Sequence, residues 1–396
     1  MSLINLRKTG WMVLFLLLSL TGARAEQAER PFIRFATFNS SLNRSKAGAL
    51  LAELKRPDSR QAQKVAAIIQ HLRPDVLLLN EFDYTPEGEA VSAWQTNYLG
   101  RGQAGQQPIL YQYIYTAPVN TGVPSGVDLN RDDQADGPQD AFGFGRFPGQ
   151  YGMVVLSRFP ILQQKIRTFR KLKWRDMPQA HLPLDPQTGA AWLTPQAQEL
   201  FRLSSKSHWD VPIQLPGRTV HFLASHPTPP VFDGPEDRNG KRNHDEIRLW
   251  ADYIRSKSTP YLRDDQGVSG GLAATADFVI AGDLNADPHD GDSFGRAIWQ
   301  LLNHPRVNAT FTPSSEGAKE ASKLQGRANQ TQTGKPEHDT ADFNDRSTGN
   351  LRIDYVLPST SLPIVSSGVF WPAQGEPGHD WIDASDHRLV WIDIRR

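Results

Sequence analysis

The apolar and polar positions of this chain repeat with two different periods. Residues 32–38 alternate and are rich in β-forming side chains, which predicts a strand. Residues 61–72 carry apolar side chains at helical spacing, which predicts an amphipathic helix that Pro74 ends. Residues 75–79 form a continuous apolar run, which is typical of a central strand buried on both faces.

The same two patterns continue to the end of the chain. Further strands are predicted at 153–156, 220–224, 278–281, 353–357 and 389–394, and further helices at 244–254 and 293–302. Alternating strands and helices indicate the α/β class with packed sheets. Four Gly-, Pro- and polar-rich segments are too long for ordinary loops and are expected to be substrate-shaping loops or disordered inserts: 84–150, 171–210, 256–275 and 311–349. With no repeat and no biased linker, residues 32–396 are predicted to form one domain.

The first 25 residues have the pattern of a cleavable signal peptide. Arg7 and Lys8 precede the apolar run of residues 11–20, and Ala23 and Ala25 supply the small residues of a cleavage site. Because this apolar run is short for a bilayer span, export to a periplasm or to the medium is favoured over an uncleaved membrane anchor. After cleavage the chain is not expected to span a membrane.

Composition narrows the chemistry further. Of 396 residues, 43 are Lys or Arg and 43 are Asp or Glu; without residues 1–25 these counts become 40 and 43, a net charge of −3. Broad electrostatic capture of nucleic acid is therefore not predicted, although a local basic groove is compatible with this balance. There are no cysteines, which excludes disulfides, thiolate zinc sites and cysteine nucleophiles. No feature indicates an obligate protein partner.

Polar side chains gather where predicted strands end, which is where α/β proteins place ligands and catalytic groups. They are Asn39, Asn80, Glu81, His226, Asp283, Asn285, Asp354, Asp386 and His387. Any one of them could be a turn former or a helix cap. Six such sites on six strands favour a shared site, and carboxylates, amides and histidines without thiols suit a hard divalent ion, Mg²⁺ or Mn²⁺.

Seven motifs occur in an order that resembles the endonuclease/exonuclease/phosphatase superfamily, which includes deoxyribonuclease I, exonuclease III, sphingomyelinases and inositol-polyphosphate phosphatases. The motifs are TFN (37–39), LLNE (78–81), GMVVLSR (152–158), SHP (225–227), GDLNAD (282–287), RIDY (352–355) and SDH (385–387). The resemblance spans residues 32 to 394. It implies a four-layer α/β/β/α sandwich with two packed central mixed β-sheets, and metal-dependent hydrolysis of phosphate esters.

The resemblance also implies a role for each strand-end residue. Glu81 would be the principal metal ligand, with Asn39 and Asp386 holding or orienting the metal or its water. His387 would be the general base, with a pKa near neutrality suited to that task, and Asp354 would fix its tautomer.

Three further roles complete the implied site. Asp283 and Asn285 would position the attacking water and a phosphate oxygen, and His226 would stabilise the transition state or assist the leaving oxygen. One departure stands out: deoxyribonuclease I has a glutamate that pairs with the first catalytic histidine, and the matching stretch here, residues 150–152, has no acid.

Two other segments could contribute ligands. Arg242 and Asn243, in the basic run 238–243, and Lys206 with His208 are candidates for binding a substrate phosphate; a solvated helix start and ordinary surface side chains are the alternatives. Residues 128–137 open like a calcium loop but lack its Gly and its bidentate Glu, so a polar turn is the alternative to a structural Ca²⁺ site.

The sequence thus predicts an exported, metal-dependent phosphoesterase that cleaves phosphodiesters by in-line attack of water, with a nuclease among the candidates. A phosphomonoesterase or phospholipid phosphodiesterase is the first alternative, and a catalytically silent binding module is the second. The sequence leaves the substrate open between nucleic acid, other phosphodiesters and phospholipid.

Overall fold

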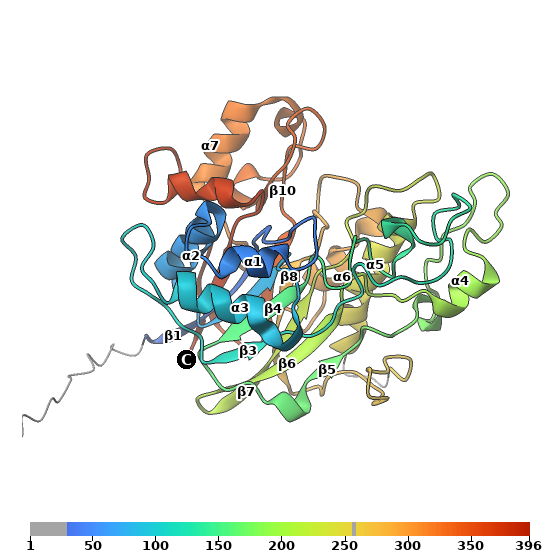
Figure 1. Ribbon diagram of the computed structural model, residues 1–396, viewed down its shortest axis with the longest axis horizontal. Coiled ribbons are helices and arrows are strands. Elements are labelled where there is room, and N and C mark those ends of the chain that lie inside the picture. The colour runs from blue at the N-terminus through green and yellow to red at the C-terminus, as the bar shows by residue number, and fades with distance from the viewer. Residues whose placement is uncertain (1–29, 256–258) are drawn as a thin grey trace, which may run out of the picture. The chain divides into compact units, whose positions relative to one another are not determined.

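Two β-sheets stacked face to face occupy the centre of the structure (Figure 1). The computed structural model describes residues 30–255 and 259–396, so the signal peptide predicted for residues 1–25 lies outside the described residues. Residues Phe32–Arg396 form one compact unit.

The first sheet has six strands in the order β12-β13-β1-β2-β4-β3. They are β1 (Phe32–Asn39), β2 (Val76–Asn80), β3 (Tyr113–Tyr115), β4 (Met153–Ser157), β12 (Ile364–Val369) and β13 (Val390–Arg395). The pair β1–β2 is parallel and the other pairs are antiparallel, so the sheet is mixed.

The second sheet has five strands in the order β11-β8-β7-β6-β5. They are β5 (Arg167–Thr168), β6 (His208–Leu215), β7 (Arg218–Ser225), β8 (Asp277–Asp283) and β11 (Asp354–Pro358). Here β7 and β8 run parallel and the other pairs are antiparallel. A separate short ladder joins β9 (Ala341–Asp342) to β10 (Asn350–Leu351).

Side chains on alternate faces of each strand enter different layers, as the period of two requires. On β1, Ile33 and Phe35 enter the core between the sheets, where the Phe35 ring lies 5.9 Å from that of Phe222. Ala36 and Phe38 of the same strand face the outer helices. The strand predicted at 278–281 divides likewise between an inner and an outer core.

Helices cover the outer face of each sheet (Figure 1). The first sheet is covered by α1 (Ala49–Leu54), α2 (Arg60–Leu72) and α3 (Glu89–Trp94), and the second by α5 (Arg238–Tyr253) and α6 (Trp299–Leu302). The predicted four-layer sandwich is therefore confirmed. The remaining helices, α4 (Pro195–Leu200) and α7 (Glu316–Gln325), lie in the long segments between strands.

Two predicted helices differ from the structure. The helix predicted at 244–254 begins six residues earlier, after Asp237, whose φ of 51° turns the chain into α5. The helix predicted at 293–302 is broken at Gly295, with a φ of 58°, into a short 3₁₀ turn and α6. Among the described residues, no helix has the length and apolar composition needed to cross a membrane.

Candidate active site

The parallel strand pairs bring polar residues from both sheets to one place. Asn39 and Asn80 end β1 and β2 in register, and the next residue, Glu81, has a φ of 56°. In the other sheet Asp283 ends β8. Asn39 Nδ2 donates to Asp283 Oδ2 at 3.0 Å, and the Asp283 amide donates to Asn80 Oδ1 at 3.2 Å. Two side chains therefore join the carboxyl ends of strands that belong to different sheets.

Asp283 is the centre of the cluster. Its Oδ2 lies 3.3 Å from His226 Nε2 and 3.7 Å from His387 Nε2. Asp354 stands directly opposite Asp283 in the antiparallel register of β8 and β11. Burial raises the pKa of Asp283, and the neighbouring charge of Asp354 raises it further, although His387 opposes both. The buried position of Asp283, next to a second carboxylate, thus disfavours its charged form.

His387 forms a buried pair with Asp354. Its Nδ1 lies 2.9 Å from Asp354 Oδ2, and Thr340 Oγ1 donates to the same oxygen at 2.9 Å. The carboxylate acceptor fixes the proton on Nδ1 and turns Nε2 toward Asp283. Burial alone would lower the pKa of His387, but the charges of Asp354 and Asp283 outweigh it and raise the pKa. The pKa of His387 is thus raised to about 10, above the near-neutral value expected from the sequence.

Glu81 and Asp386 lie on the side of the cluster formed by the first sheet. Asn43 Nδ2 donates to Glu81 Oε2 at 2.8 Å, and Ser41 Oγ donates to Asp386 Oδ1 at 3.0 Å. Burial raises the pKa of Glu81, whereas the charges of His387 and Lys206 lower it. Lys206 is 6% exposed, and burial lowers its pKa, whereas the charges of Glu246, Glu81 and Asp283 oppose this effect. This predicted phosphate ligand therefore lies near the acids of the cluster, but it is nearly buried.

The predicted metal ligands fit a hard divalent ion. Asn39, Glu81 and Asp386 supply oxygen atoms, and the buried acids around them raise one another's pKa values. Within the described part of the chain, Asp354 Oδ1 is buried without a hydrogen-bond partner. Asp283, Asp354 and His387 also form one of two groups in the described residues whose ligand atoms lie close enough to hold a metal ion. Oxygen donors with excess negative charge suit Mg²⁺ or Mn²⁺.

His226 is buried and lacks a partner for one ring nitrogen. Its Nδ1 has no hydrogen bond within the described part of the chain. Burial lowers its pKa well below the usual value, and the charges of Lys206 and His387 add to this effect. Gln150, in the stretch 150–152 that has no acid, donates to the Arg44 carbonyl. Burial thus favours the neutral form of His226, and its Nδ1 has no acidic partner among the described residues.

Asn285 links two loops beside Asp283. Its amide donates to Asp283 Oδ1 at 3.0 Å, and its Nδ2 donates to the Pro227 carbonyl at 3.1 Å. The φ of Asn285 is 50°, a left-handed conformation that Asn tolerates better than most residues. The motif GDLNAD thus holds the loop of His226 next to the strand of Asp283.

The structure buries three of the predicted phosphate ligands, Arg242, Asn243 and His208. Arg242 is 4% exposed and donates to the carbonyls of Leu203 and Arg202 at 2.8 and 2.9 Å. Asn243 Nδ2 donates to backbone carbonyls at 2.8 and 2.9 Å, and His208 contacts Ser204 and a carbonyl of α5. Because α5 begins at Arg238, these residues lie inside a packed helix or under it rather than in a solvated loop.

Residues 128–137 form a polar turn. One carboxylate oxygen of Asp128 accepts the amides of Asn130 and Arg131, and the other accepts the amide of Asp133. The loop contributes to neither group that could hold a metal ion in the described residues. The hydrogen bonds of an Asx-type turn thus account for its alternating acids without Ca²⁺.

Two supporting residues were missed from the sequence. Glu246 on α5 accepts the Ser205 amide at 2.6 Å through Oε1 and the Thr228 amide at 2.8 Å through Oε2, so it positions the loops of Lys206 and His226. Thr340 holds Asp354, as described above. Glu246 gave no distinct signal, because it directly follows His244 and Asp245 in a largely polar helix. Thr340 gave no signal either, because it lies in an insert.

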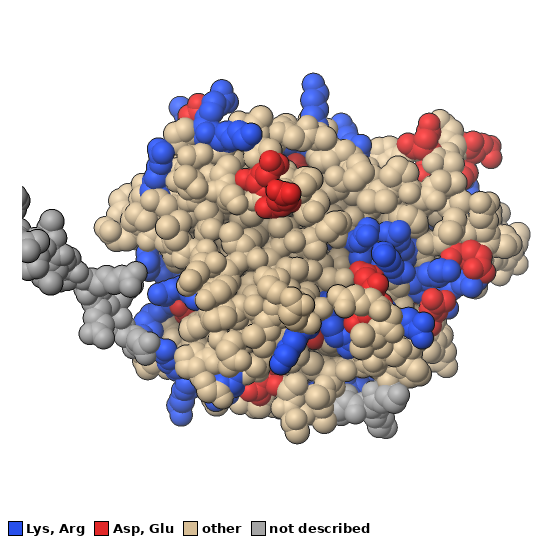
Figure 2. Space-filling model, turned by 60° about the horizontal axis from the view of Figure 1, so that its bottom comes forward, with Lys and Arg blue, Asp and Glu red and all other residues tan. Residues whose placement is uncertain are grey.

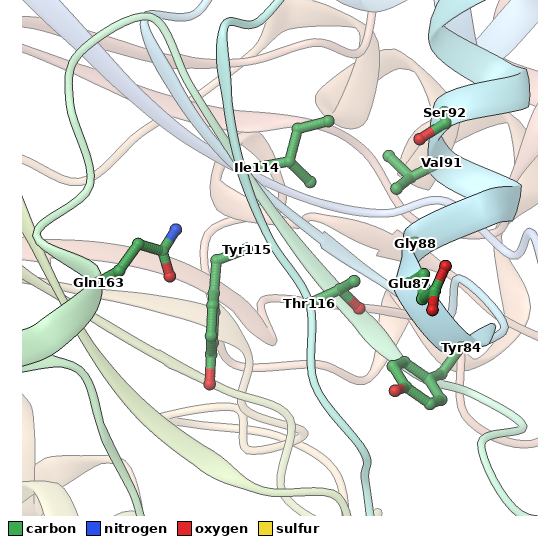
Figure 3. Close-up of a pocket in the computed structure, with 9 residues that line it drawn as sticks. All are labelled: Tyr84, Glu87, Gly88, Val91, Ser92, Ile114, Tyr115, Thr116 and Gln163. Atoms are coloured by element: carbon green, nitrogen blue, oxygen red, sulfur yellow. The ribbon is translucent and has the colours of Figure 1, made fainter.

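A separate cavity of about 300 Å³ lies between α3 and β3 (Figure 3). Tyr84, Val91, Tyr115 and Thr116 are among its lining residues, and Glu87 is its acid. None of its lining residues belongs to the cluster around Asp283.

Acids, amides and a histidine–carboxylate pair at the strand ends of a four-layer sandwich define a hydrolase site. The family model of the endonuclease/exonuclease/phosphatase family matches residues 36–387. The chain belongs to this family, as its motifs predicted.

Several solved structures resemble the chain over 92% of its length. One is an endonuclease/exonuclease/phosphatase from Beutenbergia cavernae, with 18% identity, a TM-score of 0.48 and 72% of that chain covered. Another is sphingomyelinase C from Streptomyces griseocarneus, with 14% identity, a TM-score of 0.48 and 99% coverage. The catalytic domain of human nocturnin has 14% identity, a TM-score of 0.43 and 95% coverage. No curated protein matches the chain.

Proposed function

We propose that this chain is an exported, divalent-metal-dependent phosphodiesterase that works by in-line attack of an activated water. The observation that carries the proposal is the convergence on Asp283. Its carboxylate lies 3.3 and 3.7 Å from the Nε2 atoms of His226 and His387, and it accepts a hydrogen bond from Asn39 of the other sheet. Such a group can bind, orient and deprotonate a water next to a phosphate.

In the proposed reaction His387 Nε2 removes a proton from the attacking water as its oxygen bonds to phosphorus and the P–O bond to the leaving alcohol breaks. Asp354 holds Nδ1–H and stabilises the imidazolium that forms. The leaving oxygen then takes up a proton from solvent and the imidazolium releases one to solvent. Asp283 and Asn285 orient the water. His226, neutral because of its burial, donates from Nε2 to an oxygen that gains charge in the transition state. A bound Mg²⁺ or Mn²⁺, held by Glu81, Asn39 and Asp386, would neutralise phosphate oxygens.

The charges near the cluster favour a diester over a monoester. A phosphomonoester carries nearly two negative charges at neutral pH. Arg242 was the predicted cation best suited to bind two phosphate charges, but it is buried against backbone carbonyls. Lys206 is then the remaining predicted cation, and its charge acts on Glu81. On the face in Figure 2, basic side chains are interspersed with acidic ones and do not form a continuous basic surface.

A substrate panel tests the activity. With Mg²⁺ or Mn²⁺, bis-p-nitrophenyl phosphate should be cleaved faster than p-nitrophenyl phosphate, while plasmid DNA, RNA and sphingomyelin identify the natural class. H387A should lower kcat about 10²–10⁴-fold with an unchanged circular dichroism spectrum, the range expected for a general base. H289A, at an exposed histidine outside the cluster, is the matched control. Near-normal turnover in H387A would falsify the mechanism, and faster monoester cleavage would favour the phosphatase alternative.

Export is supported by the N-terminal sequence alone. Expression of the full chain with its first 25 residues should yield a protein outside the cytoplasm whose N-terminus is Glu26. A protein retained in the cytoplasm or membrane with residues 1–25 attached contradicts this part of the proposal.

A further inference from the structure

A second group of metal-binding side chains lies on the outer helix α5. His244 and Asp245 are consecutive residues of this helix, and His181 comes from the segment that precedes α4. The three offer ligand atoms within 4.8 Å of one another. None of them belongs to the cluster around Asp283, so this is a separate arrangement of two imidazoles and one carboxylate.

The two imidazoles converge on one oxygen. Asp245 Oδ1 lies 2.8 Å from His181 Nδ1 and 3.0 Å from His244 Nδ1. The two histidine rings meet edge to face with centroids 4.5 Å apart. Phe294 packs against both, at centroid distances of 5.3 and 5.7 Å, and so limits how far the rings can turn.

The other carboxylate oxygen is already fixed. Asp245 Oδ2 accepts from Trp174 Nε1 at 2.7 Å and from the His181 amide at 2.7 Å. Metal-binding carboxylates are commonly oriented by such outer hydrogen bonds. Asp245 is fully buried, whereas the His181 side chain is 40% exposed. The group therefore has a rigid inner ligand and an open side through which an ion and a water can enter.

We propose that His181, His244 and Asp245 bind a divalent transition metal of the zinc type. Zinc bonds of about 2.0–2.1 Å at tetrahedral angles place two ligand atoms about 3.3 Å apart. The present separations are a few tenths of an ångström shorter, and His181, on a partly exposed loop, can move by that amount. Two imidazoles and one carboxylate suit zinc, whereas Mg²⁺ prefers oxygen ligands. A water would complete the coordination on the exposed side.

Such an ion would fix the part of α5 that supports the active site. Asn243 and Glu246 flank the pair His244–Asp245. Asn243 holds the carbonyls of Thr228 and Leu284, and Glu246 holds the amides of Ser205 and Thr228. The metal would also tie the loop of His181 to this helix. Its role is then structural, and it differs from that of the hard ion expected beside Glu81.

Zinc titration of the chelator-treated, full-length mature protein tests the proposal. In excess Mg²⁺, calorimetry should show one Zn²⁺ per chain, and Co²⁺ in its place should give visible d–d absorption. H181A should weaken Zn²⁺ binding by at least about 10–100-fold, the loss that even an outer partner of a metal ligand causes. H244A should do the same, so that the result does not depend on one variant.

Two controls separate this site from others. H221A removes another histidine–aspartate pair, the partly exposed His221 with Asp210 at 2.7 Å, and should bind Zn²⁺ normally. E81Q alters the catalytic cluster and should also leave this binding unchanged. The proposal is overturned when the wild type takes up no Zn²⁺ in excess Mg²⁺. His181, His244 and Asp245 would then be a hydrogen-bonded group that binds no metal. The proposal is equally overturned when E81Q abolishes binding that H181A and H244A retain.

Discussion

Replacing Asp354 by Asn tests how the fold controls the proposed base. Thr340 Oγ1 accepts the amides of Ile353 and Asp354 at 3.0 Å each, so its own proton is directed at the side chain of residue 354. An Asn there must place its oxygen toward Thr340 and His387, with its NH₂ where Asp354 Oδ1 now has no partner. The variant therefore keeps the tautomer of His387 and removes the negative charge.

The size of the effect follows from that charge. An opposite charge at hydrogen-bond distance shifts a pKa by about 1–3 units, and each unit is worth about 1.36 kcal/mol. The Asp354 carboxylate raises the pKa of His387, so D354N lowers it by that amount. The imidazolium formed during attack loses the same stabilisation, about 1.4–4 kcal/mol, and kcat should fall about 10–1,000-fold.

The assay is the pH dependence of kcat for bis-p-nitrophenyl phosphate at saturating metal. His387 must be neutral to accept a proton, so activity rises with pH through its pKa. A lower pKa in D354N moves this rise about 1–3 pH units toward acid. The pH shift and the loss of rate should appear together.

Asp342 provides the matched control. Its Oδ2 pairs with Arg388 Nη2 at 3.0 Å, one residue from His387, and among the described residues the hydrogen bonds and ion pairs of its side chain go to Gln325 and Arg388. D342N should leave the pH at which kcat rises unchanged. The reasoning is refuted when D354N keeps both the wild-type kcat and the wild-type pH at which kcat rises. It is also refuted when D342N moves this rise toward acid as D354N does.

Three further predictions concern charge and metal. E81Q should raise the metal concentration needed for half-maximal activity by about 10–100-fold or more. E87Q, at the separate cavity, should not raise it. If E81Q and the wild type need the same metal concentration, Glu81 is not a metal ligand. EDTA should abolish activity and added Mg²⁺ or Mn²⁺ should restore it; turnover that persists in chelator removes the metal. Burial, followed by the charges of Asp287 and Asp290, raises the pKa of Asp339 to about 8. The folded protein thus holds a proton that the unfolded chain releases from about pH 4, so stability falls as pH rises from about 4 to 8. D339N should remove this fall and stabilise the fold above pH 8 by up to about 5 kcal/mol, measured by urea unfolding at pH 5 and pH 9; equal gains at both pH values would contradict it.

The strands and their polar ends could be predicted from the sequence because both depend on local pattern. The period of two in residues 32–38 is typical of a strand. The continuous apolar run in residues 75–79 is typical of a strand that is buried on both faces of a sheet. Parallel pairing then puts the residues that follow such strands at one edge, which is how Asn39, Glu81 and Asp283 could be grouped before any coordinates. The serines and glycine of β12 carry no such pattern, and that strand was missed.

Tertiary packing decided the directions of side chains on helices and inserts. Arg242 and Glu246 lie on one helix, yet one ends against backbone carbonyls and the other holds two loops at the cluster, because the start of α5 at Arg238 sets the helical phase. Thr340 reaches Asp354 only through the path of an insert. Hydrophobic periodicity is local, so the residues that end the strands follow from the order of amino acids alone. Which of these residues face one another depends on how the two sheets and their loops pack, and that is a property of the folded protein.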